Sequence, residues 1–181
     1  MKALKIVLQI LGILLLVPAV ALATLSFNHR NSDGPSLLFP GGELVSGDLY
    51  SGVEPDWTFT NEIQTIELQL EDPLSSRLIW ITETEGKIYV ISKFMNTAIG
   101  RIWKHWAVAA DERDGLAVVR IGDTRYQRRI VRIHDSEVPY SLATRLTEKY
   151  GRGDSSPQAI AVNRRDIETG NTWVFELAPR M

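Results

Sequence analysis

The segment of this chain best equipped for chemistry reads Arg-Ile-Trp-Lys-His-Trp, from Arg101 to Trp106. Tryptophan rings stack on planar groups, and guanidinium and ammonium groups hold anions through charge-assisted hydrogen bonds. The segment therefore predicts a site for a planar ligand with an anionic tail. The alternative, which we favour, is that Trp103 and Trp106 lie three residues apart on one helical face and pack on a sheet, with Arg101, Lys104 and His105 in solvent.

A second cationic cluster consists of four arginines on one predicted strand, namely Arg125, Arg128, Arg129 and Arg132. Alternation along a strand places two of them on each face. One pair could line an anion site. We favour instead cross-strand pairing with acidic neighbours and protection of an exposed strand edge, because charged side chains commonly serve both purposes.

Other kinds of site have little support. Glu54 and Asp56 flank a proline, which is typical of a turn rather than of a carboxylate pair for acid–base chemistry. His29, His105 and His134 are far apart and lack the spacing of metal ligands, so we expect no metal site. The chain has no cysteine, which excludes disulfides, cysteine-bound metals and a thiol nucleophile. No Gly-x-Ser-x-Gly motif points to a serine hydrolase.

Strand-like patterns dominate the chain after residue 43. Residues 65–71 alternate strictly and place Ile66, Leu68 and Leu70 on one face. Two runs on either side of Glu85-Gly86 predict a hairpin, and two runs around Gly122-Asp123-Thr124 predict another. The predicted strands are 65–71, 77–84, 87–92, 116–121, 125–133 and 172–177.

Two helices are predicted between these strands. Residues 98–112 bring several apolar side chains to one face: Ile99, Ile102, Trp103, Trp106 and Ala110. Residues 138–150 show the same periodicity and stop at Gly151. Hairpins with two interposed helices predict an α+β protein with a mainly antiparallel, barrel-like sheet.

The N-terminus has the pattern of a membrane-directed segment. Lys2 and Lys5 precede an uncharged, mostly apolar run from Ile6 to Leu25, which is long enough to cross a hydrocarbon core as a helix. The lysines favour the cytoplasmic side, so the rest of the chain would face outward. The alternative is a cleaved signal peptide, for which Ala21-Leu22-Ala23 supplies a small-x-small site.

These patterns divide the chain into an anchor or signal (1–25), a linker (26–43) and one domain (44–181). The predicted location is the outer face of the cytoplasmic membrane, on a single-pass helix, or outside the cell if the signal is cleaved. Without Lys2 and Lys5 the chain has 18 basic and 22 acidic residues, a net charge of −4. This acidic balance argues against a nucleic-acid partner. No twin arginine precedes the apolar run, so export would be of the unfolded chain, and a flavin would have to be acquired outside.

Several motifs resemble those of a known superfamily. They are Glu54–Phe59, Ile66–Leu68, Leu78–Trp80, Gly86–Val90, Gly100–Trp103, Val119–Ile121 and Tyr126 through Val131–Ile133. Together they resemble uncharacterised members of the split β-barrel superfamily, which includes pyridoxamine-phosphate-oxidase-like and deazaflavin-dependent FMN-binding proteins. The resemblance spans Gly47 to Arg180. It implies a split β-barrel preceded by the N-terminal hydrophobic helix, and a homodimer with the site at the seam.

In flavin-binding relatives, the phosphate is held near the strand and helix that correspond to residues 88–101. The resemblance assigns cofactor binding to Ser92, Lys93, Arg101 and Trp103, with Asn96 and Thr97 as further candidates. The consecutive Ser-Arg-Lys run of the oxidases is missing here, and Phe94-Met95 interrupts the segment. FMN or a deazaflavin is therefore implied by the resemblance alone.

Two functions follow from these patterns. The first is an exported, membrane-anchored split-barrel domain that binds a small ligand or a partner without turnover. The second is a flavin- or deazaflavin-dependent oxidoreductase, which rests on the superfamily analogy. We favour the first, because export without a twin arginine and the missing phosphate-binding run both weaken the second.

Overall fold

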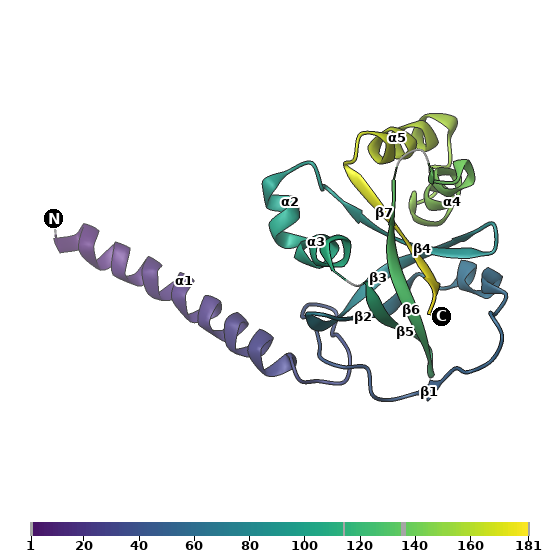
Figure 1. The fold of residues 1–181 in the computed structure, drawn as a ribbon. Coiled ribbons are helices and arrows are strands. Elements are labelled where there is room, and N and C mark those ends of the chain that lie inside the picture. The colour runs from purple at the N-terminus through teal and green to yellow at the C-terminus, as the bar shows by residue number, and fades with distance from the viewer. Residues whose placement is uncertain (1, 114, 135–136, 181) are drawn as a thin grey trace.

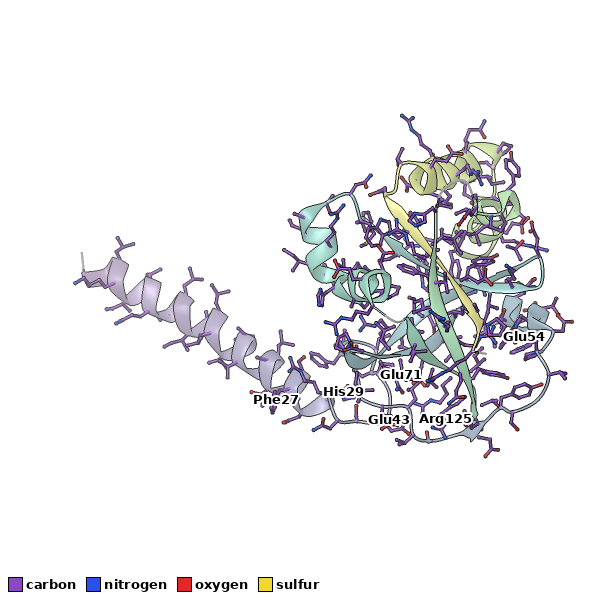
Figure 2. The ribbon with its side chains drawn as sticks, in the orientation of Figure 1. Phe27, His29, Glu43, Glu54, Glu71 and Arg125 are labelled. Atoms are coloured by element: carbon purple, nitrogen blue, oxygen red, sulfur yellow. The ribbon has the colours of Figure 1, made fainter. Side chains whose placement is uncertain are left out.

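A computed structural model describes residues 2–113, 115–134 and 137–180. Met1 and Met181, at the ends of the predicted segments 1–25 and 44–181, lie outside the described residues. Figure 1 shows helix α1 (Lys2–His29) projecting to the left from an α+β domain. The described side chains of α1 project into solvent on all sides (Figure 2), and the large apolar ones among them are more than half exposed. It is the one helix of the described chain that is long and apolar enough to cross a membrane or to act as a signal.

The domain is built on a closed barrel. In the described residues, six strands pair with antiparallel neighbours in the order β6-β5-β2-β3-β4-β7, and β7 pairs back with β6 to close the ring. A two-residue strand, β1 (Asp48–Leu49), adds in parallel to β6. The six strands are β2 (Thr65–Glu71), β3 (Leu74–Thr84), β4 (Lys87–Lys93), β5 (Leu116–Ile121), β6 (Thr124–Ile133) and β7 (Thr172–Pro179). The α+β class, the antiparallel barrel and both hairpins are therefore confirmed.

Apolar side chains from all six strands fill the barrel. Ile66, Leu68 and Leu70 are buried on the predicted face of β2, where they pack with Phe175 and Leu177 of β7. A 3₁₀ helix, η1 (Trp57–Glu62), contributes the fully buried Trp57 to this core. Asp56 caps η1 by accepting a hydrogen bond from the Thr58 amide, so the predicted turn leads into a 3₁₀ helix.

The predicted helix 98–112 is two helices, α2 (Ala98–Trp103) and α3 (His105–Glu112). Lys104 lies between them with a ψ of 34°, outside the helical range. The break separates the predicted apolar face into two halves. Trp106 and Ala110 on α3 are buried, whereas Ile99, Ile102 and Trp103 on α2 are more than three-quarters exposed. The prediction that the two tryptophans share a buried face is therefore wrong.

Two further helices pack beside the barrel. α4 (Tyr140–Tyr150) matches the second predicted helix and is followed by Gly151. α5 (Pro157–Glu168) was not predicted, although Ser156 caps it and Pro157 occupies its first turn, a common pattern at helix starts. Leu142 and Leu146 of α4 and Ile167 of α5 form a second core with Tyr89 and Val174 on the strands.

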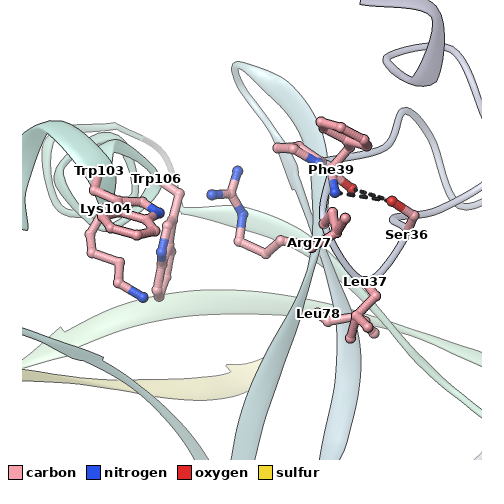
Figure 3. Close-up of a pocket in the computed structure, with 10 residues that line it drawn as sticks. Ser36, Leu37, Phe39, Arg77, Leu78, Trp103, Lys104 and Trp106 are labelled. Carbon is pink, nitrogen blue, oxygen red and sulfur yellow. Dashed lines mark hydrogen bonds between the residues drawn. The ribbon is translucent and has the colours of Figure 1, made fainter. Parts of the chain in front are cut away.

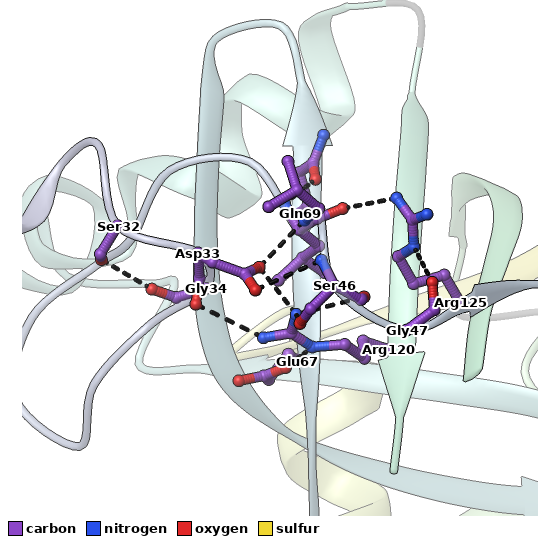
Figure 4. A network of polar contacts seen from close by, with 11 residues as sticks. Ser32, Asp33, Gly34, Ser46, Gly47, Glu67, Gln69, Arg120 and Arg125 are labelled. Carbon is purple, nitrogen blue, oxygen red and sulfur yellow. Dashed lines mark hydrogen bonds and ion pairs between the residues drawn. The ribbon is translucent and has the colours of Figure 1, made fainter. Parts of the chain in front are cut away.

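The segment after α1 lies against the barrel. Gly41 bridges to Ser76 of β3, and the Leu44 amide donates to the buried side chain of Gln69. Figure 4 shows the principal attachment, the Arg120 cluster, which we define as Asp33, Ser46, Glu67 and Arg120. Arg120 Nη1 donates to Asp33 Oδ1 at 2.7 Å and to Ser46 Oγ at 2.6 Å, and its Nε donates to Glu67.

Backbone geometry reinforces this attachment. Gly34 has a φ of 83°, which side-chain-bearing residues rarely adopt. A Cβ at Gly34 would also lie 2.4 Å from the Arg120 guanidinium. The predicted linker 26–43 thus comprises the last turn of α1 and a folded segment held by the barrel.

Candidate functional site

A groove crosses the surface between the turn 36–39, strand β3 and the junction of α2 with α3. Its first part encloses about 450 Å³ and its continuation about 380 Å³. The two parts share Leu37, Leu78 and Lys104, so we treat them as one groove. Figure 3 shows the first part, with the Arg77 guanidinium reaching from β3 toward Trp106 and Trp103.

Arg77 is the most unusual group of the groove. Its Nη2 donates to Ser75 Oγ at 2.8 Å, and the guanidinium lies 5.5 Å from the centre of the Trp106 ring. The buried Nε has no hydrogen-bond partner, and no described carboxylate forms an ion pair with Arg77. Burial lowers the pKa of Arg77 to about 10, so the side chain is still charged at neutral pH. A buried, uncompensated cation is costly, and an anionic ligand would offset that cost.

Lys104 supplies a second cation. It lies at the α2–α3 junction and lines both parts of the groove. Burial, and then the nearby charge of Arg77, lower the pKa of Lys104. Among the described residues, Lys104 Nζ has neither an ion pair nor a hydrogen bond. Two cations therefore face one groove without an acidic partner.

The remaining walls are apolar and aromatic. Trp106 is buried beside Arg77, while Trp103 is 81% exposed at the rim. Leu37 and Leu38 form the tip of a tight turn, in which the Ser36 amide donates to the Phe39 carbonyl at 3.0 Å. In the continuation of the groove, Trp80 stacks on Tyr150 with ring centres 4.5 Å apart. The groove thus combines positive charge with flat, apolar surfaces.

The four residues assigned by resemblance do not converge on one point. Lys93 and Trp103 line the groove, in different parts of it. Ser92 is buried, and its hydroxyl donates to Met95 Sδ. Arg101 Nε donates to the Met95 carbonyl, and Lys93 Nζ donates to Asn163 Oδ1. Asn96 and Thr97 also bond elsewhere, Asn96 to the Thr169 carbonyl and Thr97 to the Gly100 amide at the start of α2. These residues therefore do not form a ready cradle for a flavin phosphate.

The arginines of β6 serve mainly in the fold. Arg128 is buried and forms two hydrogen bonds to the Glu54 carboxylate, at 2.7 and 2.8 Å. Arg132 pairs with Asp111 and lies over the Trp173 ring. Both residues have the expected acidic partners, but the expected cross-strand pairing is wrong, because Glu54 precedes η1 and Asp111 lies on α3. The expected edge protection is wrong, because β6 is an interior strand of the closed barrel.

Sequence patterns missed Arg77, the central residue of the groove. It is the only charged residue between Leu74 and Thr82, among apolar and hydroxyl side chains. That isolation was the available signal. Arg77 and Trp106 meet only because the chain folds α3 over β3, and local spacing does not reveal such an approach.

The closed barrel flanked by helices places this chain among α+β proteins of split-barrel-like fold. A crystal structure of the conserved hypothetical protein Rv2991 from Mycobacterium tuberculosis is similar to it, with a TM-score of 0.52 and 14% sequence identity. The similarity covers 74% of this chain and 84% of that one, and it shows the fold alone. Neither a known protein family nor a curated protein matches the sequence.

Proposed function

We propose that this chain is a membrane-anchored, exported barrel whose groove binds a small ligand with an anionic group and an apolar or aromatic body. The observation that carries the proposal is Arg77, a partly buried side chain with a buried, unpartnered Nε that lines the groove without a described carboxylate partner. Lys104 adds a second cation, and Trp103 and Trp106 offer ring faces for the body of the ligand.

The ligand proposal is tested with 1-naphthyl phosphate and its neutral analogue 1-naphthol. The full chain in lipid nanodiscs is titrated, and binding is followed by tryptophan fluorescence. We expect saturable binding of the phosphate only. Arg77→Met should raise its dissociation constant about tenfold, the loss of one charge-assisted hydrogen bond or about 1.4 kcal/mol.

Arg113→Met is the matched control, because Arg113 pairs with Asp72 on the surface outside the groove. It should leave the dissociation constant unchanged. Equal affinity in wild type and Arg77→Met, or no saturable binding of the phosphate, would refute the proposal.

Anchoring and outward orientation are supported by the length of α1 and by the lysines that precede its apolar run. An alkaline phosphatase fused to the C-terminus should be active, since this enzyme folds only outside the cytoplasm. An inactive phosphatase fusion, together with fluorescence of a C-terminal fluorescent-protein fusion that is confined to the cytosol, would contradict the orientation. The mass of the mature chain distinguishes the alternatives, because loss of residues 1–23 identifies a cleaved signal.

The alternative function is a flavin- or deazaflavin-dependent oxidoreductase. Ser92 and Arg101 are both hydrogen-bonded to Met95, so the cofactor would have to bind through other residues of the groove. Lys93 and Trp103 in the groove support it. A flavin absorbance band in protein purified from membranes, lost on Lys93→Ala, would favour this function. Colourless protein that does not quench the fluorescence of added FMN would exclude it. Homodimerisation, which the superfamily resemblance implies, is tested by the mass of the particle in nanodiscs.

A further inference from the structure

Large apolar side chains surround the mouth of the groove and face solvent. We call this set the apolar rim: Leu37, Leu38, Phe94, Ile99, Ile102 and Trp103. Each is more than 60% exposed, the most exposed being Leu37 at 87%. Leu37, Phe94 and Trp103 line the groove itself. Isolated exposed apolar residues are ordinary, but a gathered set marks a surface that contacts something apolar.

Helix α2 shows that the exposure is built into the fold. Only Gly100 of α2 is buried, and a Cβ there would lie 1.9 Å from the Phe94 carbonyl. The close contact at Gly100 fixes which side of the short helix faces inward. Ile99, Ile102 and Trp103 are consequently directed outward.

The surroundings of the apolar rim are cationic. No acidic residue occurs in 34–42, 74–82 or 93–110, the three segments that form the groove and its mouth. The same segments carry Arg77, Lys93, Arg101 and Lys104. Tryptophan and aliphatic side chains flanked by lysine and arginine are typical of surfaces that lie in the interfacial region of a membrane with anionic lipids.

The position of α1 brings this surface to a bilayer. Leu37 follows His29, the last residue of α1, by eight positions, so the two can be at most about 28 Å apart. In Figure 1, α2 lies on the left-hand side of the domain, the side toward which α1 extends. Arg120 holds Asp33 and Ser46, which lie between α1 and the barrel. These bonds limit how far the side of the domain that carries α2 can turn away from α1.

We propose that the apolar rim inserts into the interfacial region of the same membrane that α1 crosses, with the neighbouring cations at the lipid headgroups. This proposal rests on the proposed anchoring by α1. A second copy of the chain is the main rival occupant. A two-fold interface would place the cationic patch against itself, with no acid in the three segments to compensate it, whereas an anionic lipid surface is complementary.

The absence of cysteine makes a direct test straightforward. Single cysteines are introduced by Ile102→Cys on the rim, Val162→Cys on the exposed face of α5, and Leu14→Cys in the middle of α1. Each full chain is spin-labelled and reconstituted in vesicles of phosphatidylcholine and phosphatidylglycerol. Collision with apolar oxygen and with a water-soluble nickel chelate then reports the immersion of each label.

We expect the oxygen-to-nickel collision ratio at Ile102→Cys to exceed that at Val162→Cys several-fold. A difference of this size is expected between a label immersed about 5–10 Å into the membrane and a label in water. Equal ratios at these two positions, with a high ratio at Leu14→Cys, would overturn the rim proposal and leave the anchor intact. A low ratio at Leu14→Cys would overturn the anchor and, with it, this inference. Strong dipolar coupling between two Ile102→Cys labels, with neither oxygen nor nickel reaching them, would assign the rim to a second copy and overturn the inference.

Discussion

Arg77 and Arg128 each place a guanidinium beside a tryptophan, but Arg128 is buried, Arg77 is half-buried, and their partners differ. Arg128 forms paired hydrogen bonds to Glu54, donates to the Leu177 carbonyl and lies 5.1 Å from the centre of the Trp57 ring. Arg77 has Ser75 as its one hydrogen-bond partner and no described carboxylate. The first arrangement holds η1 and β7 together. The second leaves hydrogen-bonding capacity directed at the groove.

This difference predicts that replacing the two arginines changes the free energy of unfolding by unequal amounts. Arg128→Met should lower the free energy of unfolding by about 3 kcal/mol, because it removes four hydrogen bonds and leaves the Leu177 carbonyl without its side-chain donor. Arg77→Met should change it by less than about 1 kcal/mol, because relief of desolvation offsets the lost contact with Trp106. Urea denaturation of the full chain in detergent micelles measures both. A comparable loss in the two variants would show that Arg77 is a structural residue.

At the scale of single residues, the sequence revealed the chemistry of the site but not its geometry. The segment 101–106 was identified as the most reactive in composition, and Trp103, Lys104 and Trp106 do line the groove. The orientation of Trp103 was mispredicted, because a spacing of three residues implies a shared face only if the helix continues between them. The unusual backbone at Lys104 ends α2 there.

At the scale of secondary-structure elements, the Asp33 carboxylate helps to attach the folded segment between α1 and β2 to the barrel. A hydrogen bond from the Ser46 side chain, with further contributions from the Val45 amide and Arg120, lowers the pKa of Asp33 to about 2. Because the folded-state pKa lies below the unfolded value of 3.8, Asp33 contributes stability that is complete above that value. The contribution is lost as the pH falls from about 4 to about 2.

Asp33→Asn should therefore lower the melting temperature at pH 6 and lower it clearly less at pH 2.5, where wild-type Asp33 is largely protonated in the unfolded chain and partly in the folded one. Thermal denaturation of both proteins at the two pH values measures this. A gap between their melting temperatures that is the same at both pH values would contradict the assigned role of Asp33.

The strands were more predictable than the helices and loops. Alternation and turn residues located both hairpins, because each depends on local hydrogen bonding and a local apolar pattern. Helix α5 was missed because half of its twelve residues are polar or charged, and Ile167 is its only buried residue. Strand β1 is two residues long and exists only through pairing with β6, so no local pattern marks it.

At the scale of the whole molecule, β7 closes the barrel. Glu176 lies opposite Tyr89 of β4 and Val131 of β6, so its backbone lies between two neighbouring strands. The order of strands around the ring was not predictable, because β7 follows β6 only after α4 and α5, and the β6–β7 pairing depends on how those helices pack. The antiparallel barrel itself was predicted from the number and spacing of strands.

Glu176→Pro should lower the free energy of unfolding by about 2 kcal/mol or more, because proline removes a backbone donor from an interior strand. Glu176→Ala is the matched control. It retains the amide and removes only the ion pair with Lys87, which is more than half exposed, so its cost should stay below about 1 kcal/mol. Chemical denaturation compares the two. Equal effects would mean that β7 does not need this backbone bond to close the ring.

The Arg120 cluster has a consequence for how the domain moves. A loose tether would let the barrel tumble above the lipid and present each of its faces in turn. With Asp33 and Ser46 held by one arginine, rotation about the tether is restricted, and a chain anchored as proposed would keep the groove at a constant height. Encounter with a lipid-borne ligand then becomes a search in two dimensions, governed by lateral diffusion in the bilayer.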